Sequence, residues 1–158
     1  MTAFAQVWSF SRDRLSQAHE GLTDAQMAWR QHLEGHCIFE YLFHIAGAEH
    51  YWAVKMAGAE EEEKLFSAVR SGFLRDGPFP FAGDDFRREK AEAALEKSRE
   101  QLVQLIESPS QDQLEMKIES PLGPTITGRE GLIRVAQHAA YHTGQIWVLR
   151  MDPRFPAG

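Results

Sequence analysis

The sequence predicts an all-α protein: a four-helix bundle with a long crossover between its second and third helices and a short β-hairpin before the last helix. Apolar residues recur at three- and four-residue steps over four long segments, which is typical of amphipathic helices. Only one short stretch alternates apolar and polar residues as a strand does. Long helices with so little strand pack as an antiparallel bundle. Because 158 residues suit one domain, we expect a single domain over residues 1–158.

The first long helix is predicted over residues 2–19 and the second over residues 37–57. Gly21 and Gly58 follow them, and glycine readily takes the left-handed conformation that ends a helix. Thr23 or Asp24 is predicted to cap a short helical turn between the two. The second helix has a wide apolar face, which indicates that it is buried.

The loop at residues 71–85, SGFLRDGPFPFAGDD, contains three glycines and two prolines and is predicted to be a crossover. Four glutamates at residues 60–63 precede it, and they suit the positive end of a helix dipole at a helix start. The third long helix is predicted over residues 85–107, with its apolar residues facing the core.

A β-hairpin and the last helix are predicted to complete the chain. Residues 114–118 alternate apolar and polar side chains, SPLGP forms a turn, and residues 125–127 provide the second strand. Thr127 is then the expected cap of the last helix, over residues 128–151, with Glu130 completing a capping box.

Composition argues against two kinds of partner. The net charge is −6 and no basic stripe is present, so we expect no nucleic-acid partner. No apolar run approaches the roughly 18 residues that span a bilayer, and the N-terminus lacks the pattern of a signal peptide. We therefore expect no membrane association.

Cys37 is the only cysteine, which fits a reducing compartment, and we expect a cytoplasmic protein.

The segment HAAYH places His138 and His142 four residues apart, so both rings lie on one face of the last helix. This face also carries Val135 and Leu149, which indicates that the rings point inward. A buried polar group without a partner costs about 1–3 kcal/mol, and a metal ion would be such a partner. The same spacing also occurs in surface pairs and in hydrogen-bonded core pairs. Ala139 occupies the position of the zincin glutamate, so the motif carries no general base of its own.

His44 is the candidate third ligand, because it lies on the inward stripe of the second helix. If the second and fourth helices run parallel, the three histidines come level. Three histidines without a carboxylate leave positions open, as in catalytic zinc sites. The ligand type does not distinguish Zn, Ni or Fe. The other histidines are expected to be exposed polar residues: His19, His32, His36 and His50.

Several residues near these histidines by helical spacing are candidates for supporting or pocket roles: Glu40, Tyr41, Tyr51, Arg134, Tyr141 and Gln145. Glu40, four residues before His44, could accept its ring N–H. Arg134, four residues before His138, could bind an anionic group of a substrate or form a surface ion pair. Each candidate is also compatible with a packing or surface role. Cys37 lies about 10 Å along the helix from His44, so we expect it to pack rather than act as a nucleophile.

Three motifs resemble the DinB/YfiT-like family: LTDAQMAWR before the second helix, FEYLFHIAGAEHYW within it, and VAQHAAYHTGQI in the last helix. The likeness spans nearly the whole chain. It implies a four-helix bundle, commonly a homodimer, in which His44, His138 and His142 hold a divalent transition metal.

The family includes transferases and isomerases that use bacillithiol or mycothiol. The resemblance therefore implies a small-molecule substrate, a low-molecular-weight thiol as cosubstrate, and a metal-dependent thiol S-transferase or hydrolase. The family often has a Pro-Gly-rich, Trp-Ser segment before the first ligand helix, whereas this chain has HLEGHCIFE, so the substrate itself is not implied. The alternative is a non-enzymatic bundle that binds metal for stability or stress sensing.

Overall fold

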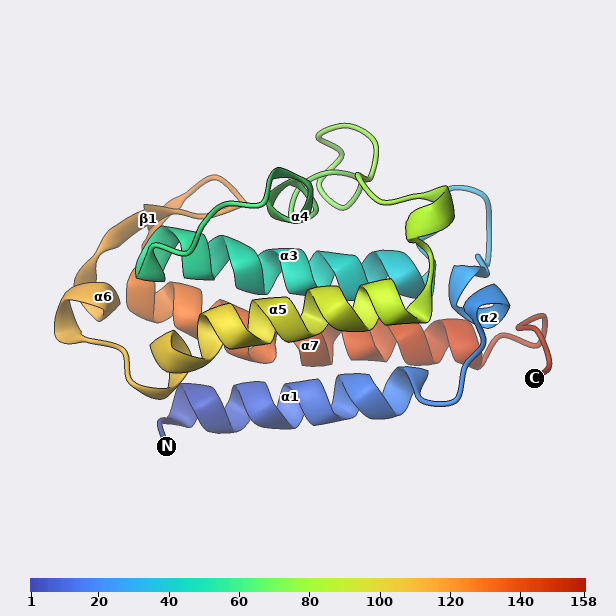
Figure 1. The fold of residues 1–158 in the computed structure, drawn as a ribbon, viewed down its shortest axis with the longest axis horizontal. Helices are drawn as coiled ribbons and strands as arrows, with labels where there is room; N and C mark the ends of the chain where they lie inside the picture. The colour runs from blue at the N-terminus through green and yellow to red at the C-terminus, as the bar shows by residue number, and fades with distance from the viewer.

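The computed structural model describes residues 1–158, and four long helices form its framework (Figure 1). They are α1 (Ala3–His19), α3 (Ile38–Ala57), α5 (Arg88–Glu107) and α7 (Gly128–Arg150). Shorter elements join them: α2 (Asp24–Ala28), α4 (Glu63–Ser67), the 3-10 turn η1 (Gly83–Asp85), α6 (Gln111–Glu115), β1 (Lys117–Glu119) and β2 (Thr125–Thr127). Helix α3 packs against both α5 and α7, and α7 packs against α1. The prediction of an all-α bundle with one hairpin is therefore confirmed.

The helix directions differ from those of a simple up-and-down bundle. The segment at residues 58–87 returns the chain to the end of the bundle where α3 began, so α5 runs in the same direction as α3. Helix α7 runs in the opposite direction, beside α1 (Figure 1). The second and fourth long helices are thus antiparallel, and the expectation that they run parallel was wrong.

The predicted element boundaries agree closely with the structure, and the differences have local causes. Thr127 and Glu130 form the expected capping box at the start of α7. Helix α5 begins at Arg88, because η1 occupies the segment just before it. The hairpin pairs Ile118 with Ile126, but its first strand is shorter than predicted because Leu114 belongs to α6.

Helix α3 is the centre of the bundle, and 17 of its 20 residues are buried. Helices α5 and α7 cover two of its sides and the crossover covers another. Polar residues on almost any face of α3 therefore lie inside the protein. None of the helices has both the length and the apolar character needed to cross a bilayer.

Candidate metal centre

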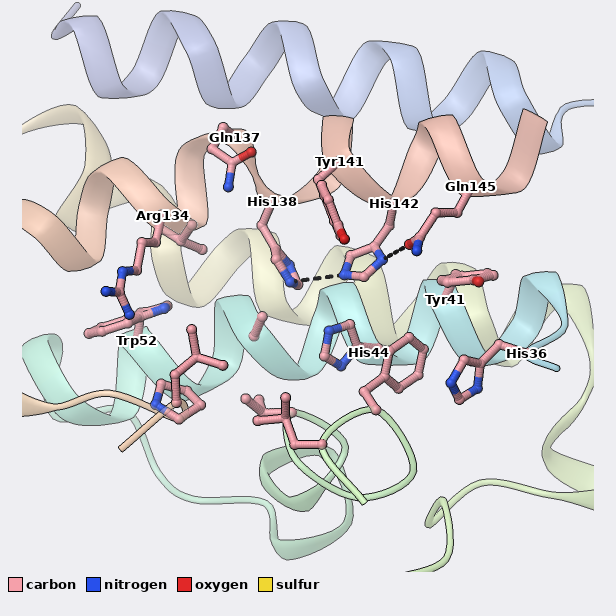
Figure 2. Close-up of a pocket in the computed structure, with 17 residues that line it drawn as sticks. His36, Tyr41, His44, Trp52, Arg134, Gln137, His138, Tyr141, His142 and Gln145 are labelled. Atoms are coloured by element: carbon pink, nitrogen blue, oxygen red, sulfur yellow. Dashed lines mark hydrogen bonds between the residues drawn. The ribbon is translucent and has the colours of Figure 1, made fainter. Parts of the chain in front are cut away.

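Three histidines from two helices converge beneath the crossover (Figure 2). His44 comes from α3, and His138 and His142 come from α7. One ring nitrogen from each lies within 4.8 Å of the others. The Nε2 atoms of His138 and His142 are 3.1 Å apart. The structure thus brings together the three residues that the sequence pattern singled out.

The antiparallel arrangement of α3 and α7 places the three histidines at the same height along the bundle. His44 lies six residues after the start of α3 at Ile38, and His142 lies eight residues before the end of α7 at Arg150. These separations correspond to about 9 and 12 Å along the helix axes. Because the start of α3 lies beside the end of α7, the two rings meet at the same height.

The ring of His44 is oriented by the crossover. Its Nδ1 donates to the backbone carbonyl of Ala68 at 2.9 Å, so its Nε2 presents a lone pair. Gly47 allows this contact, because a Cβ at that position would lie 2.6 Å from the carbonyl oxygen of Leu65. The missing side chain lets α4 approach α3 and places the Ala68 carbonyl above the histidine.

The ring of His142 is oriented from its own helix. Its Nδ1 donates to Oε1 of Gln145 at 2.5 Å, so its Nε2 also presents a lone pair. Histidine ligands of metals typically donate their second nitrogen to an oxygen in this way. Two of the three rings are therefore held in the tautomer that a metal requires.

The ring of His138 has no comparable support, because its buried Nδ1 has no hydrogen-bond partner. Its Nε2 faces the Nε2 of His142 at 3.1 Å. Two nitrogens bonded to one tetrahedral zinc ion, each at about 2.0–2.1 Å, would lie about 3.3 Å apart. The spacing and the donor set thus fit one shared ion, which would accept both lone pairs.

Burial keeps all three rings in the neutral form that binds metals. It lowers the pKa of His44 to about 3, with repulsion from His142 adding to the effect. It lowers the pKa of His142 to about 4, against a raising contribution from the hydrogen bond to Gln145. Burial also holds the pKa of His138 well below its ordinary value, and repulsion from the other two rings adds to this.

The histidines line a cavity of about 660 Å³, which is a typical size for a small-molecule site. Its walls come from α3, α7, the crossover and the turn of the hairpin. None of its 17 lining residues is an aspartate or glutamate. Figure 2 shows Arg134 and Trp52 at one end, His36 at the other, and the three histidines between them.

Phe73 forms part of the wall, although nothing in the sequence pointed to it. It stacks on His44, with ring centroids 3.9 Å apart, and on His36, at 4.0 Å. Its ring therefore lies between the two imidazoles and shields one side of the site from water. Phe73 lies in the crossover, which has no periodic pattern that would indicate where its side chains point.

Four of the predicted neighbours line the cavity: Tyr41, Arg134, Tyr141 and Gln145. Tyr41 lies beside His142, with ring centroids 5.5 Å apart. Tyr141 lies at the rim and is 62% exposed. Arg134 forms no ion pair, so the surface pairing considered for it is absent.

Glu40 does not support His44, contrary to prediction. It forms a bidentate pair with Arg30 at 2.6 and 2.7 Å and accepts from the amide of Cys37 at 2.9 Å. Burial would raise the pKa of Glu40, but hydrogen bonds from His36, Arg30 and Cys37 lower it to about 2. Helical spacing identified a possible partner for His44, whereas the loop before α3 supplied stronger donors to Glu40.

Tyr51 also lies outside the cavity. Its hydroxyl donates to the carbonyl of Glu119 at 2.6 Å, and its ring packs against Trp52 and Phe66. It joins α3 to the hairpin. The residue is two helical turns beyond His44, and by that point the α3 face is covered by β1.

The expectation that four further histidines are exposed holds only for His32. His50 is fully buried and His19 is 6% exposed. His36 is half-buried and lines the cavity. His50 is buried because α3 is covered on nearly every side. The Nδ1 of His19 donates to the carbonyl of Leu15 at 2.7 Å.

Cys37 is buried at the start of α3 and does not line the cavity. Burial is the main cause that raises the pKa of its thiol, to about 11. A thiol of this kind remains protonated near neutral pH, so Cys37 is a packing and capping residue rather than a nucleophile.

Comparison with known proteins supports the same grouping. The family model described as the DinB superfamily matches residues 8–146, which include all three histidines and most of the bundle. No curated protein matches the chain.

Proposed function

The chain belongs to the DinB superfamily, and from this premise we propose that it binds one divalent transition metal ion, Zn, Ni or Fe, through His44, His138 and His142. We propose further that it acts on a small-molecule substrate as a metal-dependent thiol S-transferase or hydrolase. The observation that carries the proposal is the convergence of three neutral imidazoles on the wall of a 660 Å³ cavity. Because no carboxylate lines that cavity, the site has no fourth protein ligand of this kind and stays open to a substrate.

The cavity lining lets the metal ion, rather than a side chain, activate the nucleophile. A bound ion would supply positive charge that stabilises a thiolate or polarises a substrate. The chain itself offers no aspartate or glutamate in the cavity that could act as a general base. A free thiol has a pKa of about 8.5 and a zinc-bound water a pKa of about 7, so neither nucleophile needs such a base. The resemblance to thiol-dependent members of the family supports transferase over hydrolase activity.

The residues around the histidines have defined tasks in this proposal. The Ala68 carbonyl and Gln145 hold the rings of His44 and His142 with Nε2 facing the site. Phe73 and Tyr41 exclude water from one side. The Trp52 end of the cavity is left for the body of the substrate (Figure 2).

The test is an assay of conjugation between bacillithiol and an electrophile, with zinc-loaded wild-type protein, His142→Ala and the exposed control His32→Ala. We expect activity in the wild type and the control, and a loss of at least 100-fold in His142→Ala. No activity with any thiol and electrophile at full metal loading would contradict the enzymatic proposal. A non-enzymatic metal protein would instead show a fourth protein ligand and a large fall in melting temperature on chelation.

We also propose that the protein is a homodimer of the cytoplasm. Large apolar side chains remain exposed on the two neighbouring helices α1 and α7: Val7, Phe10, Ile133, Trp147 and Val148. Such side chains can be covered by a second copy. Sedimentation equilibrium should give twice the chain mass, and a monomer at all concentrations would contradict this part of the proposal.

A further inference from the structure

Arg134 is a cation without a partner at one end of the cavity. It lines the cavity and its Nη1 is buried, yet that nitrogen has no hydrogen-bond partner. One turn earlier on α7, the carboxylate of Glu130 accepts from the amide and hydroxyl of Thr127 at 2.7 and 2.8 Å. Glu130 is therefore committed to the helix cap and does not pair with the guanidinium.

The charge of Arg134 is not balanced by anything else in the cavity. None of the lining residues is acidic, and the histidines there carry no permanent charge. Arg134 is half-buried as a residue, but its Nη1 is buried, and a buried donor left without an acceptor is costly. A single guanidinium is matched by a single negative charge, and its planar fork suits the two oxygens of a carboxylate.

The position of Arg134 relates this charge to the metal centre. It precedes His138 by four residues, which is about 6 Å along the axis of α7. Trp52, Val135 and Leu122 also line the cavity and supply apolar side chains to its wall. In Figure 2 the side chain of Arg134 extends toward Trp52, beside the three histidines. A ligand that reaches both places needs an acidic group at one end and an apolar segment between.

We propose that the site is selective for a carboxylate-bearing substrate or cosubstrate, whose carboxylate binds Arg134 while its reacting atom lies at the three histidines. This inference rests on the proposed function, because it assumes a metal ion at the histidines. It names the chemical class of the ligand, which the family resemblance left open.

The test uses cobalt-loaded protein and two thiols of equal length, 6-mercaptohexanoate and 6-mercaptohexanol. Binding of a thiolate to Co(II) produces a charge-transfer absorption that can be titrated without measuring catalysis. We expect the acid to bind roughly 10- to 100-fold more tightly than the alcohol, since a hydrogen bond between charged groups contributes that much. Arg134→Gln should remove the preference, and the exposed control Arg129→Gln should keep it.

The outcomes separate this inference from the proposed function. If neither thiol changes the cobalt spectrum, the proposed function fails at the metal centre. If both thiols bind with equal affinity to the wild type, the metal site stands and the carboxylate site is overturned. Equal loss of preference in Arg134→Gln and Arg129→Gln would assign it to net charge and overturn the inference as well. If Arg134→Gln does not fold, Arg134→Lys replaces it in the test. The lysine variant should keep only part of the preference for the acid. If it keeps the full wild-type preference, a pair between the guanidinium and the carboxylate is contradicted.

Discussion

The two sides of α3 differ in how their buried polar groups are satisfied. On the side facing α1 and α5, Glu49 is 1% exposed and its carboxylate is fully engaged. It accepts from Nε1 of Trp8 at 2.8 Å and from the hydroxyl of Ser98 at 2.7 Å, and it lies 3.6 Å from the guanidinium of Arg12. This network joins three helices, although Nη1 of Arg12 is buried and has no hydrogen-bond partner.

His50 belongs to the same closed side. Its Nδ1 donates to Oε1 of Gln101 at 2.7 Å, and its Nε2 accepts from the amide of Glu62 at 3.0 Å. Both ring nitrogens are thus satisfied by the protein. A fully buried histidine with two partners links α3 to α5 and to the start of the crossover.

The side facing α7 is open by the same criterion. His138 has a buried nitrogen without a partner, Arg134 has another, and the Nε2 atoms of His138 and His142 face each other. Arg134 and His138 are half-buried, whereas Glu49 and His50 are almost fully buried. Each side has one arginine nitrogen without a hydrogen-bond partner, but only the α7 side combines it with an unpartnered histidine nitrogen, and both of those residues line the cavity. Unpartnered polar atoms thus indicate a ligand site where they belong to residues that line a cavity.

Acid should destabilise the metal-free protein more than any single substitution, because the open side depends on neutral histidines. The folded-state pKa of His44 and of His142, about 3 and 4, lies below the unfolded value of 6.5. The unfolded chain therefore binds more protons, and stability present above pH 6.5 is lost as the pH falls. Each of these two histidines therefore accounts for a loss of roughly 2 kcal/mol in the free energy of unfolding between pH 7 and pH 5.

Urea unfolding in the presence of a chelator, at pH 7 and at pH 5, measures this loss of stability in the metal-free protein. His138→Leu should reduce it, since one histidine whose pKa is lowered by burial is removed. Glu40, which is paired with Arg30, affects stability over a lower pH range. Its folded-state pKa is about 2, so the stability that it contributes is lost only as the pH falls below about 4.5. Equal stability of the wild type at pH 7 and pH 5 would contradict the account.

Glu49→Ala should break the closed side. It leaves Trp8 and Arg12 without their buried partner, and breaking such a pair costs about 3–5 kcal/mol. Metal affinity, measured by competition with a chromophoric chelator at a temperature where the variant is folded, should change less than threefold. A large loss of metal affinity with little loss of stability would mean that the two sides of α3 are not independent.

His138→Leu should weaken metal binding without destabilising the fold, which is the opposite of the result expected for Glu49→Ala. We expect metal affinity to fall by more than about 100-fold, which exceeds the effect of losing a supporting residue. The metal-free variant should gain about 1 kcal/mol, because a buried nitrogen without a partner is replaced by apolar atoms. Thermal unfolding with and without chelator gives both quantities, and a variant that is both less stable and fully metal-loaded would refute the assignment.

Gln145→Leu should give the smallest effect on the open side. It removes the acceptor that orients His142, and such losses reduce metal affinity by about 10- to 100-fold. Gln101→Leu is the matched control, because it removes the equivalent acceptor from His50 on the closed side. The control should lose about 1 kcal/mol of stability and retain its metal affinity.

Relations along one helix could be predicted from the sequence, whereas relations between segments could not. His138, His142 and Gln145 follow from helical spacing within α7, and the inward stripe of α3 singled out His44. The Ala68 carbonyl and Phe73 come from the crossover, whose path depends on packing against Gly47 and the rings of His36 and His44.

The wrong expectations have the same origin. The relative direction of α3 and α7 is set by how far the crossover carries the chain, and no local pattern encodes that distance. Glu40 has the right spacing to reach His44, but Arg30, ten residues away in a loop, competes for it. His50 was expected outside because its angle from His44 was known while the helix that covers it was not.

X-ray absorption at the metal edge of the zinc-loaded protein tests the central claim most directly. We expect one zinc ion per chain with three imidazole nitrogens at about 2.0–2.1 Å and at least one further light-atom ligand from solvent. The three-imidazole pattern should be lost in His138→Leu. A sulfur ligand, a fourth protein ligand, or no bound zinc at saturating concentration would contradict an open three-histidine centre.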